Sequence, residues 1–321
     1  MTDIYIPSYS DIVEAHQRIL PYIHQTPVLT CSGINEMLGA DLYFKCENFQ
    51  KVGAFKFRGA TNAVLSLSDA EAANGVATHS SGNHAAALAL AAKIRGIKAY
   101  VVMPNNAAET KKMAVASYGG EITFCEPTLA ARESTLEQLA KRMGAAVIHP
   151  YNNFQVISGQ GTAAKELLEE VPSLDFILVP VGGGGLLSGT AIASKTLKPG
   201  IRVIATEPEM ANDAFQSFRC GYIVPSNNPK TVADGLLTSL GPLTFKALQM
   251  YVDDVVTVSE ELIIYAMRLI WQRMKIIIEP SSAVPVAALL QYPELCRNHK
   301  VGIILSGGNV DFSQLPFISL R

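Results

Sequence analysis

One lysine, Lys56, has a setting that suits a nucleophilic amine. The aromatic residues Phe55 and Phe57 flank it, and Gly53 and Gly59 lie three residues away on either side. An amine that is kept partly away from water has a lowered pKa, and it can then form a Schiff base with an aldehyde cofactor. A surface lysine on a short helix is the more common case for any single lysine. The interpretation of Lys56 as a nucleophile therefore needs evidence from other parts of the chain.

Three further segments marked by glycine follow in order along the chain. They are Ser80-Ser81-Gly82-Asn83-His84, Gly182-Gly183-Gly184-Gly185-Leu186 and Leu305-Ser306-Gly307-Gly308-Asn309. With the segment around Lys56 they resemble the pyridoxal-phosphate (PLP) enzymes of fold type II, the tryptophan-synthase-β type. The closest likeness is to the branch of serine racemases and serine/threonine dehydratases, and it extends from residues 26–28 to 309–311. Each motif alone is weak evidence, whereas four at compatible spacing are strong evidence.

The glycine run at 182–185 predicts a site for an anion. It follows an apolar run at 176–181 and precedes a helical stretch. Without side chains, the backbone amides of such a loop can point at one place, and the start of the next helix adds its positive dipole end. It is not a Walker loop, because no Gly-Lys-Ser/Thr follows, and its spacing does not fit G-x-G-x-x-G. The resemblance implies that the PLP phosphate is held by Gly182, Gly183, Gly184, Gly185 and Leu186.

The resemblance also assigns residues to the ring of the cofactor. Ser306, which follows the apolar run 301–305, faces the pyridine nitrogen, Asn83 hydrogen-bonds the ring hydroxyl, and Phe55 packs on the ring. A serine hydroxyl, unlike a carboxylate, gives no strong reason to protonate the ring nitrogen, so the ring is a weaker electron sink. This arrangement favours elimination of a β-hydroxyl group, or rapid reprotonation, over transamination.

The segment 80–84 predicts a site for a substrate carboxylate. It stands just before the helical stretch 85–95, where serine and asparagine are preferred capping residues and free amides bind anions well. We expect substrate contacts from Ser80, Ser81, Gly82, Asn83 and His84. The resemblance implies that Ser81 lies on the opposite face of the cofactor from Lys56, so that Lys56 removes the α-proton and Ser81 returns one. We expect His84 to be a positioned loop residue rather than a base.

An acidic loop at 207–213 predicts a site for a divalent cation. Hard cations take several oxygen ligands, and carboxylates and a carbonyl lie within reach of one loop here. The resemblance assigns Mg²⁺, or Ca²⁺ or Mn²⁺, to Glu207, the Ala211 carbonyl and Asp213. A solvated acidic loop is the alternative.

A nucleotide site has less support. Lys111 and Tyr118 match positions that contact an activating ATP in some animal racemases, but Ala86 stands where those enzymes have a glutamine. We therefore do not expect activation by ATP.

Short β-branched runs alternate with helical stretches along nearly the whole chain. The expected strands are 99–103, 176–179, 201–204 and 301–305, and the expected helices include 85–95, 161–169 and 260–274, the last with Ser259 as its N-cap. This alternation predicts an α/β fold with parallel sheets covered by helices on both faces. The resemblance implies two open twisted, mostly parallel sheets, with PLP in the cleft between a large domain (1–74 and 150–321) and a small domain (75–149).

The composition and charge of the chain limit the kinds of partner that we expect it to bind. The formal net charge of −2 gives no reason to expect nucleic acid or an anionic membrane. No apolar run is long enough to span a membrane, and residues 1–4 show no secretory signal. Five dispersed cysteines are typical of reduced thiols. We expect a cytoplasmic protein, and the resemblance implies a homodimer.

The resemblance implies α,β-elimination from L-serine and L-threonine to a keto acid and ammonia, with serine racemisation at the same site. One alternative is a threo-3-hydroxyaspartate ammonia-lyase, whose second carboxylate would bind near Arg132 or the segment 234–239. Another is a non-catalytic PLP-binding amino-acid sensor. Intact Lys56 and Ser81 argue against the sensor, because a binding module needs neither.

Overall fold

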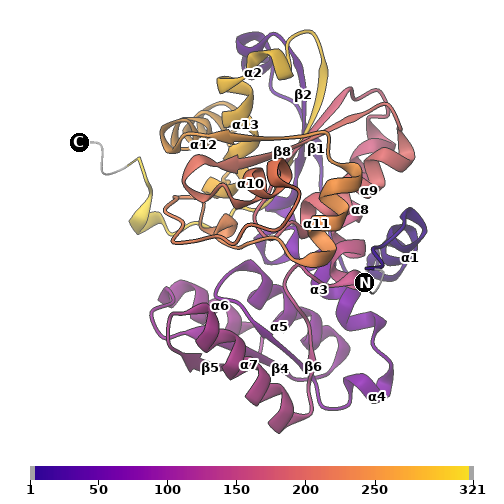
Figure 1. Cartoon of the computed structure of the whole chain (residues 1–321), viewed down its shortest axis with the longest axis vertical. Helices are drawn as coiled ribbons and strands as arrows, with labels where there is room; N and C mark the ends of the chain where they lie inside the picture. Colours follow the sequence, from indigo (N-terminus) through magenta and orange to yellow (C-terminus); the bar gives the residue numbers. More distant parts are fainter. Residues whose placement is uncertain (1–3, 318–321) are drawn as a thin grey trace.

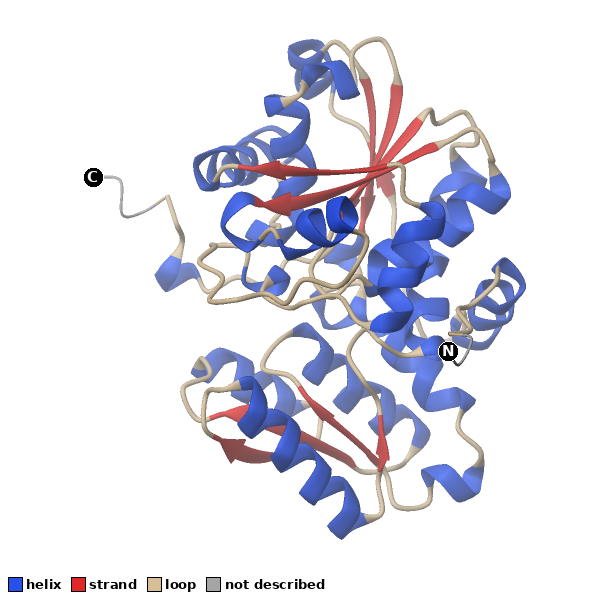
Figure 2. Ribbon diagram, in the orientation of Figure 1, coloured by secondary structure: helices blue, strands red, loops and turns tan. Residues whose placement is uncertain are grey.

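The computed structural model describes residues 4–317 and contains two sheets, which lie one above the other in the view of Figures 1 and 2. The larger has the strand order β1-β2-β10-β7-β8-β9, and the smaller has the order β5-β4-β3-β6. In both sheets the strand pairs are parallel, except that β1 pairs with β2 in the antiparallel sense. The strands are β1 (Val28–Leu29), β2 (Asp41–Cys46), β3 (Val76–His79), β4 (Ala99–Pro104), β5 (Gly120–Cys125), β6 (Ala146–Val147), β7 (Phe176–Pro180), β8 (Arg202–Pro208), β9 (Asp254–Val258) and β10 (Lys300–Leu305).

Helices cover both faces of each sheet. On the larger sheet, α2, α12 and α13 pack on one face and α8, α9 and α11 on the other, and each face has its own apolar core. On the smaller sheet, α3 and α5 form one core and α7 the other. The helices are α1 (Tyr9–Ile19), α2 (Ser32–Leu38), α3 (Lys56–Ser66), α4 (Asp69–Ala72), α5 (Asn83–Arg95), α6 (Glu109–Ser117), α7 (Leu129–Met143), α8 (Phe154–Glu170), α9 (Gly185–Leu197), α10 (Asp213–Cys220), α11 (Pro242–Tyr251), α12 (Glu260–Met274) and α13 (Pro280–Gln291).

These layers confirm the predicted fold class of two mostly parallel sheets flanked by helices. The strands of the smaller sheet all lie within residues 76–147. We propose the division into a large domain (1–74 and 150–321) and a small domain (75–149) on this basis. The helix α3 precedes the proposed boundary but shares its core with α5 of the small sheet, so it links the two units.

The predicted helix 161–169 is the one most in error, because α8 begins seven residues earlier, at Phe154. Glycines at 159 and 161 weaken the helical pattern there. Their role is close packing: a Cβ on Gly159 would lie 2.6 Å from the Cα of Gly59, and one on Gly161 would lie 2.8 Å from the carbonyl oxygen of Gly189. The helix α5 likewise begins two residues early, whereas α12 has the predicted bounds and Ser259 as its N-cap.

Within residues 4–317, none of the helices combines the length and the apolar character that a membrane span requires.

Candidate active site

Lys56 is the first residue of α3 and lies where the two units meet. Its Nζ donates a hydrogen bond of 2.9 Å to the carbonyl oxygen of Pro150 and lies 5.2 Å from the centre of the Phe55 ring. Burial lowers the pKa of the amine to about 8, and the Glu279 carboxylate partly opposes this shift. A substantial fraction of the amine is therefore neutral, and so nucleophilic, near neutral pH.

The turn before Lys56 is strained and firmly held. Val52, a β-branched residue, has φ = 56°, in the left-handed region that such residues rarely adopt. The Asn309 side chain donates 2.7 Å to the Val52 carbonyl, and the backbone amide of Phe55 donates 3.0 Å to the Ser306 carbonyl. The Phe55–Ser306 bond joins the predicted lysine segment directly to the predicted ring-nitrogen segment.

The glycine run 182–185 is buried at the start of α9, and its packing leaves no room for side chains. Gly184 has φ = +85°, and a Cβ on Gly183 would lie 2.4 Å from the Tyr151 ring. Among residues 4–317, the backbone amides of Gly183, Gly184, Gly185 and Leu186 have no hydrogen-bond acceptor. Such unpartnered amides at a helix N-terminus fit a phosphate group.

Pro150 and Tyr151 bring the amine and the glycine run together. Pro150 accepts the hydrogen bond from Lys56, and the next residue, Tyr151, packs on Gly183. His149 holds this turn, because its Nδ1 accepts from the amides of Tyr151 (3.3 Å) and Asn152 (2.9 Å). Burial, with smaller contributions from His79 and Lys56, lowers the pKa of His149 to about 4, so its ring is neutral and able to accept. No motif in the sequence marks His149 for this role.

Ser306 is buried at the end of β10. Its hydroxyl lies 3.0 Å from the hydroxyl of Ser282, which accepts from the Gly307 amide and donates to the Gly307 carbonyl, each at 2.7 Å. Ser282 thus fixes both the turn and the Ser306 side chain.

Asn83 is held by two residues outside its own loop. Its Nδ2 lies 3.2 and 3.0 Å from the two carboxyl oxygens of Glu279, and its Oδ1 accepts 3.0 Å from Asn309. Both acceptors of the Asn83 Nδ2 are thus oxygens of one carboxyl group. Glu279 is buried, and this burial, together with the charge of Asp234, raises its pKa to about 7. Sequence reasoning missed Glu279, and its only signal was an acidic residue directly before a helix that starts with Pro280.

The remaining residues that we predicted to contact substrate lie around the start of α5. Ser80 accepts 3.3 Å from the Gly82 amide, and Gly82 is the N-cap of α5. In the described part of the chain Ser81 makes no hydrogen bond to Lys56. That Ser81 lies on the opposite face of the cofactor stays a prediction. His84 is buried, and neither ring nitrogen has a partner there. Burial, and then the Lys56 charge, lower the pKa of His84 well below its usual value.

Glu207 and Asp213 lie together, buried, where β8 leads into α10. Glu207 accepts from the amides of Ala214 (3.0 Å) and Phe215 (2.8 Å), whereas neither carboxyl oxygen of Asp213 has a partner among the described residues. Burial raises the pKa of both groups, to about 7 for Asp213. No group of three or more His, Cys, Asp or Glu able to hold a metal occurs within residues 4–317. Two neighbouring buried carboxyl groups still fit a cation that also takes carbonyl oxygens, such as that of Ala211.

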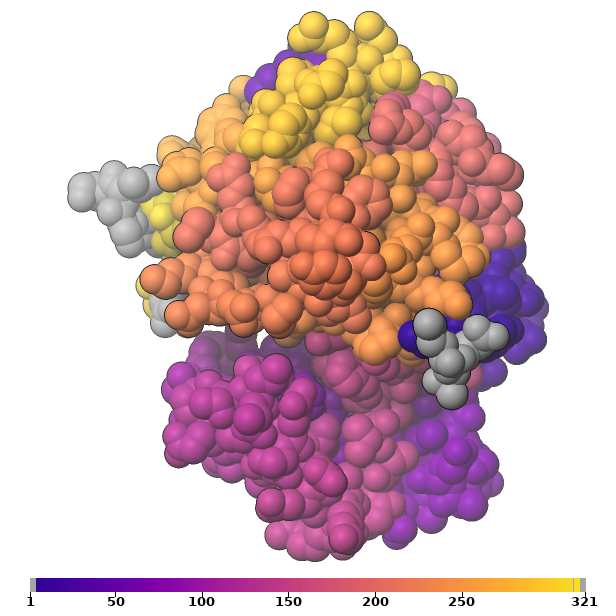
Figure 3. Space-filling view, viewed as in Figure 1, coloured from indigo at the N-terminus to yellow at the C-terminus, as the bar shows by residue number. Residues whose placement is uncertain are grey.

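A cavity of about 670 Å³ adjoins this site and includes Asn83, Ala86, Lys111 and Tyr118 in its lining. Figure 3 shows the surface hollowed where the magenta residues of the smaller unit meet the orange residues of the larger one. The Lys111 amine is paired with Asp234 at 2.5 Å. Lys56 does not line this cavity, but Gly82 and Asn83 of the predicted substrate segment do.

Comparison with known proteins agrees with this geometry. Residues 19–307 match the family described as "Pyridoxal-phosphate dependent enzyme". The chain is 53% identical to the beta-hydroxyaspartate dehydratase of Paracoccus denitrificans, over 98% of this chain and 100% of that protein. It is 54% identical to the serine racemase of Dictyostelium discoideum, over 96% of each. The crystal structure of a serine racemase from that organism covers 95% of this chain and 99% of its own, with a TM-score of 0.91.

The chain therefore belongs to the pyridoxal-phosphate dependent enzymes. Within that family it is an enzyme of the serine racemase and dehydratase group, with the fold type II architecture.

Proposed function

We propose that this protein eliminates water from L-serine and L-threonine, giving a keto acid and ammonia, and racemises serine at the same site. The observation that carries the proposal is the Lys56 amine, with its lowered pKa, joined through Pro150 and Tyr151 to a buried glycine run with unpartnered amides. These two features match the two ends of PLP, an aldehyde and a phosphate. The predicted roles of the site residues follow from this arrangement.

The residues around Lys56 would bind and orient the cofactor and the substrate. Bound PLP would supply an aldehyde for the substrate amine and a conjugated ring that stabilises negative charge at the α-carbon. The amides of residues 183–186 would hold the phosphate, the Asn83 amide would donate to the ring hydroxyl, and the Ser306 hydroxyl would serve the ring nitrogen. Amides at the start of α5 bind the substrate carboxylate. Charge and orientation are thus set by groups that the fold already holds in place.

Lys56 and Ser81 move the protons. Freed from the cofactor and neutral, Lys56 takes the substrate α-proton. The bond from the β-carbon to its hydroxyl then breaks, and the hydroxyl leaves as water with a proton equivalent to the one removed from the α-carbon. Addition of water and loss of ammonia would then give pyruvate from L-serine, or 2-oxobutanoate from L-threonine. Racemisation needs a proton on the opposite face, which Ser81 returns.

A cation and a second subunit complete the proposal. Mg²⁺, Ca²⁺ or Mn²⁺ would bind Glu207, Asp213 and the Ala211 carbonyl, where the unpartnered Asp213 oxygens and the raised pKa values favour a positive charge. Its role is structural or activating. We further propose a cytoplasmic homodimer, on the likeness to the family.

A second substrate, threo-3-hydroxyaspartate, is favoured by a specific observation. Arg132 is half-buried in α7 and lies near the site. Burial lowers the pKa of His79 and raises the pKa of Tyr151, and the Arg132 guanidinium acts on both groups by lowering their pKa values. A cation there suits the second carboxylate of hydroxyaspartate. The 53% identity to a beta-hydroxyaspartate dehydratase supports the same possibility.

One experiment separates these functions. Purified PLP-loaded protein is incubated with L-serine, L-threonine or L-threo-3-hydroxyaspartate, and keto acid and D-serine are measured with and without Mg²⁺. We expect pyruvate and D-serine from L-serine and 2-oxobutanoate from L-threonine. Turnover of hydroxyaspartate alone, impaired by Arg132→Met, would replace our first choice. A yellow protein that releases no keto acid from any of the three would favour the amino-acid sensor.

A further inference from the structure

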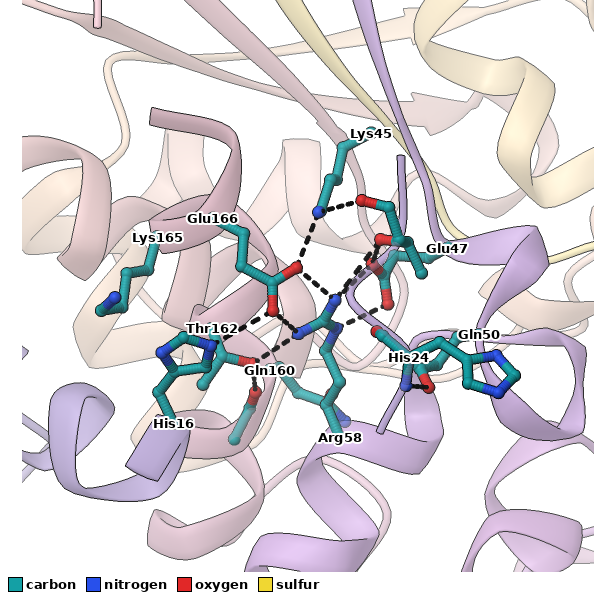
Figure 4. Close-up of polar contacts among 12 residues, drawn as sticks. His16, His24, Lys45, Glu47, Gln50, Arg58, Gln160, Thr162, Lys165 and Glu166 are labelled. Carbon is teal, nitrogen blue, oxygen red and sulfur yellow. Dashed lines mark hydrogen bonds and ion pairs between the residues drawn. The ribbon is translucent and has the colours of Figure 1, made fainter. Parts of the chain in front are cut away.

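A cluster of buried charged side chains lies beside the first turn of α3 (Figure 4). Its centre is Arg58, which follows Lys56 by two residues and is fully buried. The proposed reaction uses no member of this cluster. The other members are Thr26, Lys45, Glu47, Thr162 and Glu166.

Arg58 is bound on two sides by carboxylates. Its Nε and Nη2 donate to Glu47 at 2.7 and 2.9 Å, and its Nη1 and Nη2 donate to Glu166 at 2.7 and 2.8 Å. Nη1 also donates 3.1 Å to Thr162. Two bidentate pairs on one guanidinium fix its position and its plane, which a single ion pair would not do.

The charges of the cluster balance. Lys45 donates 2.7 Å to Glu166 and 2.6 Å to the Thr26 carbonyl, so two cations face two carboxylates. Burial by itself raises the pKa of Glu166, but hydrogen bonds and charges from His16, Arg58 and Lys45 outweigh it and hold that pKa below its usual range. Glu166 is therefore ionised near neutral pH, and removing one of its partners would leave an unpaired buried charge.

The cluster joins the segments that carry the amine and its acceptor. Arg58 lies in the first turn of α3, just after Lys56, and Glu166 lies in α8, whose N-cap Asn153 follows Pro150 by three residues. Fixing α3 against α8 therefore fixes the Lys56 amine relative to the Pro150 carbonyl. Glu47, just after β2, ties α3 to the larger sheet, and Lys45, within β2, ties α8 to it.

No side chain caps the start of α3. Its N-cap is Phe55, and the amides of Phe57 and Arg58 donate to the backbone carbonyls of Ala54 (3.3 Å) and Phe55 (3.0 Å). The first turn is held to its surroundings by Arg58 and by Gln160, whose Oε1 accepts 3.1 Å from the Gly59 amide. A Cβ on Gly59 would lie 2.4 Å from that same Gln160 side chain, so only glycine allows this approach.

We propose that Arg58 is a positioning residue for the reaction: clamped by Glu47 and Glu166, it sets where the Lys56 amine lies relative to Pro150 and the phosphate loop. The inference rests on the proposed role of Lys56. It differs from a purely structural role because loosening Arg58 should change the surroundings of one particular amine, and not only the stability of the fold.

The test uses Arg58→Lys, which keeps the charge but loses the planar fork. Its control is Asn35→Ala, which removes a side-chain hydrogen bond outside α3 and α8, the 3.2 Å bond that the Leu42 amide donates to the Asn35 Oδ1. Competitive acetylation of the PLP-free protein, followed by peptide mass spectrometry, gives the pH midpoint of Lys56 reactivity. PLP affinity and the melting temperature are measured beside it.

We expect Arg58→Lys to raise the Lys56 midpoint from near 8 by about one pH unit. PLP affinity should weaken by about tenfold. Asn35→Ala should lower the melting temperature without either effect. The proposal would be overturned if both variants lowered the melting temperature equally and left the pH midpoint of Lys56 and the PLP affinity unchanged.

A second variant keeps the test decisive if Arg58→Lys does not fold. Thr162→Val removes one hydrogen bond to Arg58 and no charge, and it should shift the Lys56 midpoint in the same direction by a smaller amount. A wild-type midpoint and PLP affinity in a folded Thr162→Val protein would then count against the proposal. Acetylation is done without PLP, so it judges Arg58 even if the proposed reaction is wrong, whereas a lack of keto acid from wild-type protein bears only on that reaction.

Discussion

The Lys56 amine donates its hydrogen bond to the carbonyl of Pro150, 94 residues further along the chain. The neighbouring residue, Tyr151, contacts the glycine run that opens α9. One short turn therefore spans the distance between the two groups proposed to hold the two ends of PLP. The following predictions test the parts of this arrangement separately.

Gly183→Ala should impair PLP binding. The added Cβ would lie 2.4 Å from the Tyr151 ring, and relieving such a contact costs about 1–3 kcal/mol. Because the loop must move, its amides lose their common direction, so PLP affinity should fall by at least about tenfold. The control is Gly200→Ala, where a Cβ meets nothing within 4 Å. Titration of each apoprotein with PLP measures the effect, and equal affinities in the two variants would contradict it.

Glu279→Gln should flatten the dependence of stability on pH. The folded pKa of Glu279 is about 7, above the ordinary value of 4.5, so folding favours the protonated form. Its stabilising contribution is full below pH 4.5 and is lost as the pH rises through 7. At pH 8 the variant should exceed the PLP-free wild type in free energy of unfolding by up to about 3 kcal/mol, and at pH 4 the two should be equal.

Urea denaturation at both pH values, with a chelator present, measures this difference. The chelator matters because Asp213 also has a pKa of about 7 and would respond to bound metal. If the gap between wild type and variant stays the same at pH 4 and pH 8, the carboxyl group of Glu279 does not titrate as described.

Mg²⁺ should stabilise the protein more at pH 8 than at pH 6. The cation needs the ionised carboxylate, and the raised pKa of Asp213 keeps much of that group protonated at the lower pH. The melting temperature should rise by about 2–4 °C for each kcal/mol of binding free energy. Asp213→Asn should remove this response, and Glu209→Gln, on an exposed residue of the same loop, should keep it. If Mg²⁺ did not change the melting temperature of the wild-type protein at pH 8, a cation site at Asp213 would be ruled out.

Ser81→Ala should separate the two reactions. Formation of D-serine should fall by about 10²–10⁴-fold, the usual contribution of one acid or base, because the proton on the opposite face is no longer supplied. Pyruvate formation depends on Lys56 and should persist. Ser173→Ala, on an exposed residue outside the site, serves as the control. A parallel loss of D-serine and pyruvate would mean that Ser81 binds substrate but does not transfer the proton.

Much of the fold could be predicted from the sequence, because its signals are local. The apolar runs that became β4, β7 and β10 are short and continuous, and the apolar stripe of α12 is regular. The start of α8 was wrong because Gly159 and Gly161 are there for helix–helix contact, which depends on partners elsewhere in the chain.

The site also contains residues that the sequence identifies and residues that it does not. Lys56 and the glycine run are local motifs, and their identity could be inferred. Glu279 and Arg58 could not, because their roles depend on side chains far away in sequence: Asn83 lies 196 residues from Glu279, and Glu166 lies 108 residues from Arg58. Only the folded chain shows that these buried charges have partners.

The most direct test of the central claim is to locate the cofactor on the chain. PLP-loaded protein is reduced with borohydride, digested, and examined by mass spectrometry, beside Lys51→Ala, which changes another lysine of the same segment, and Lys56→Ala. We predict a pyridoxyl group on the peptide that contains Lys56, in wild type and Lys51→Ala alike, and none in Lys56→Ala. A pyridoxyl group fixed to any other lysine of the wild-type protein would contradict the account.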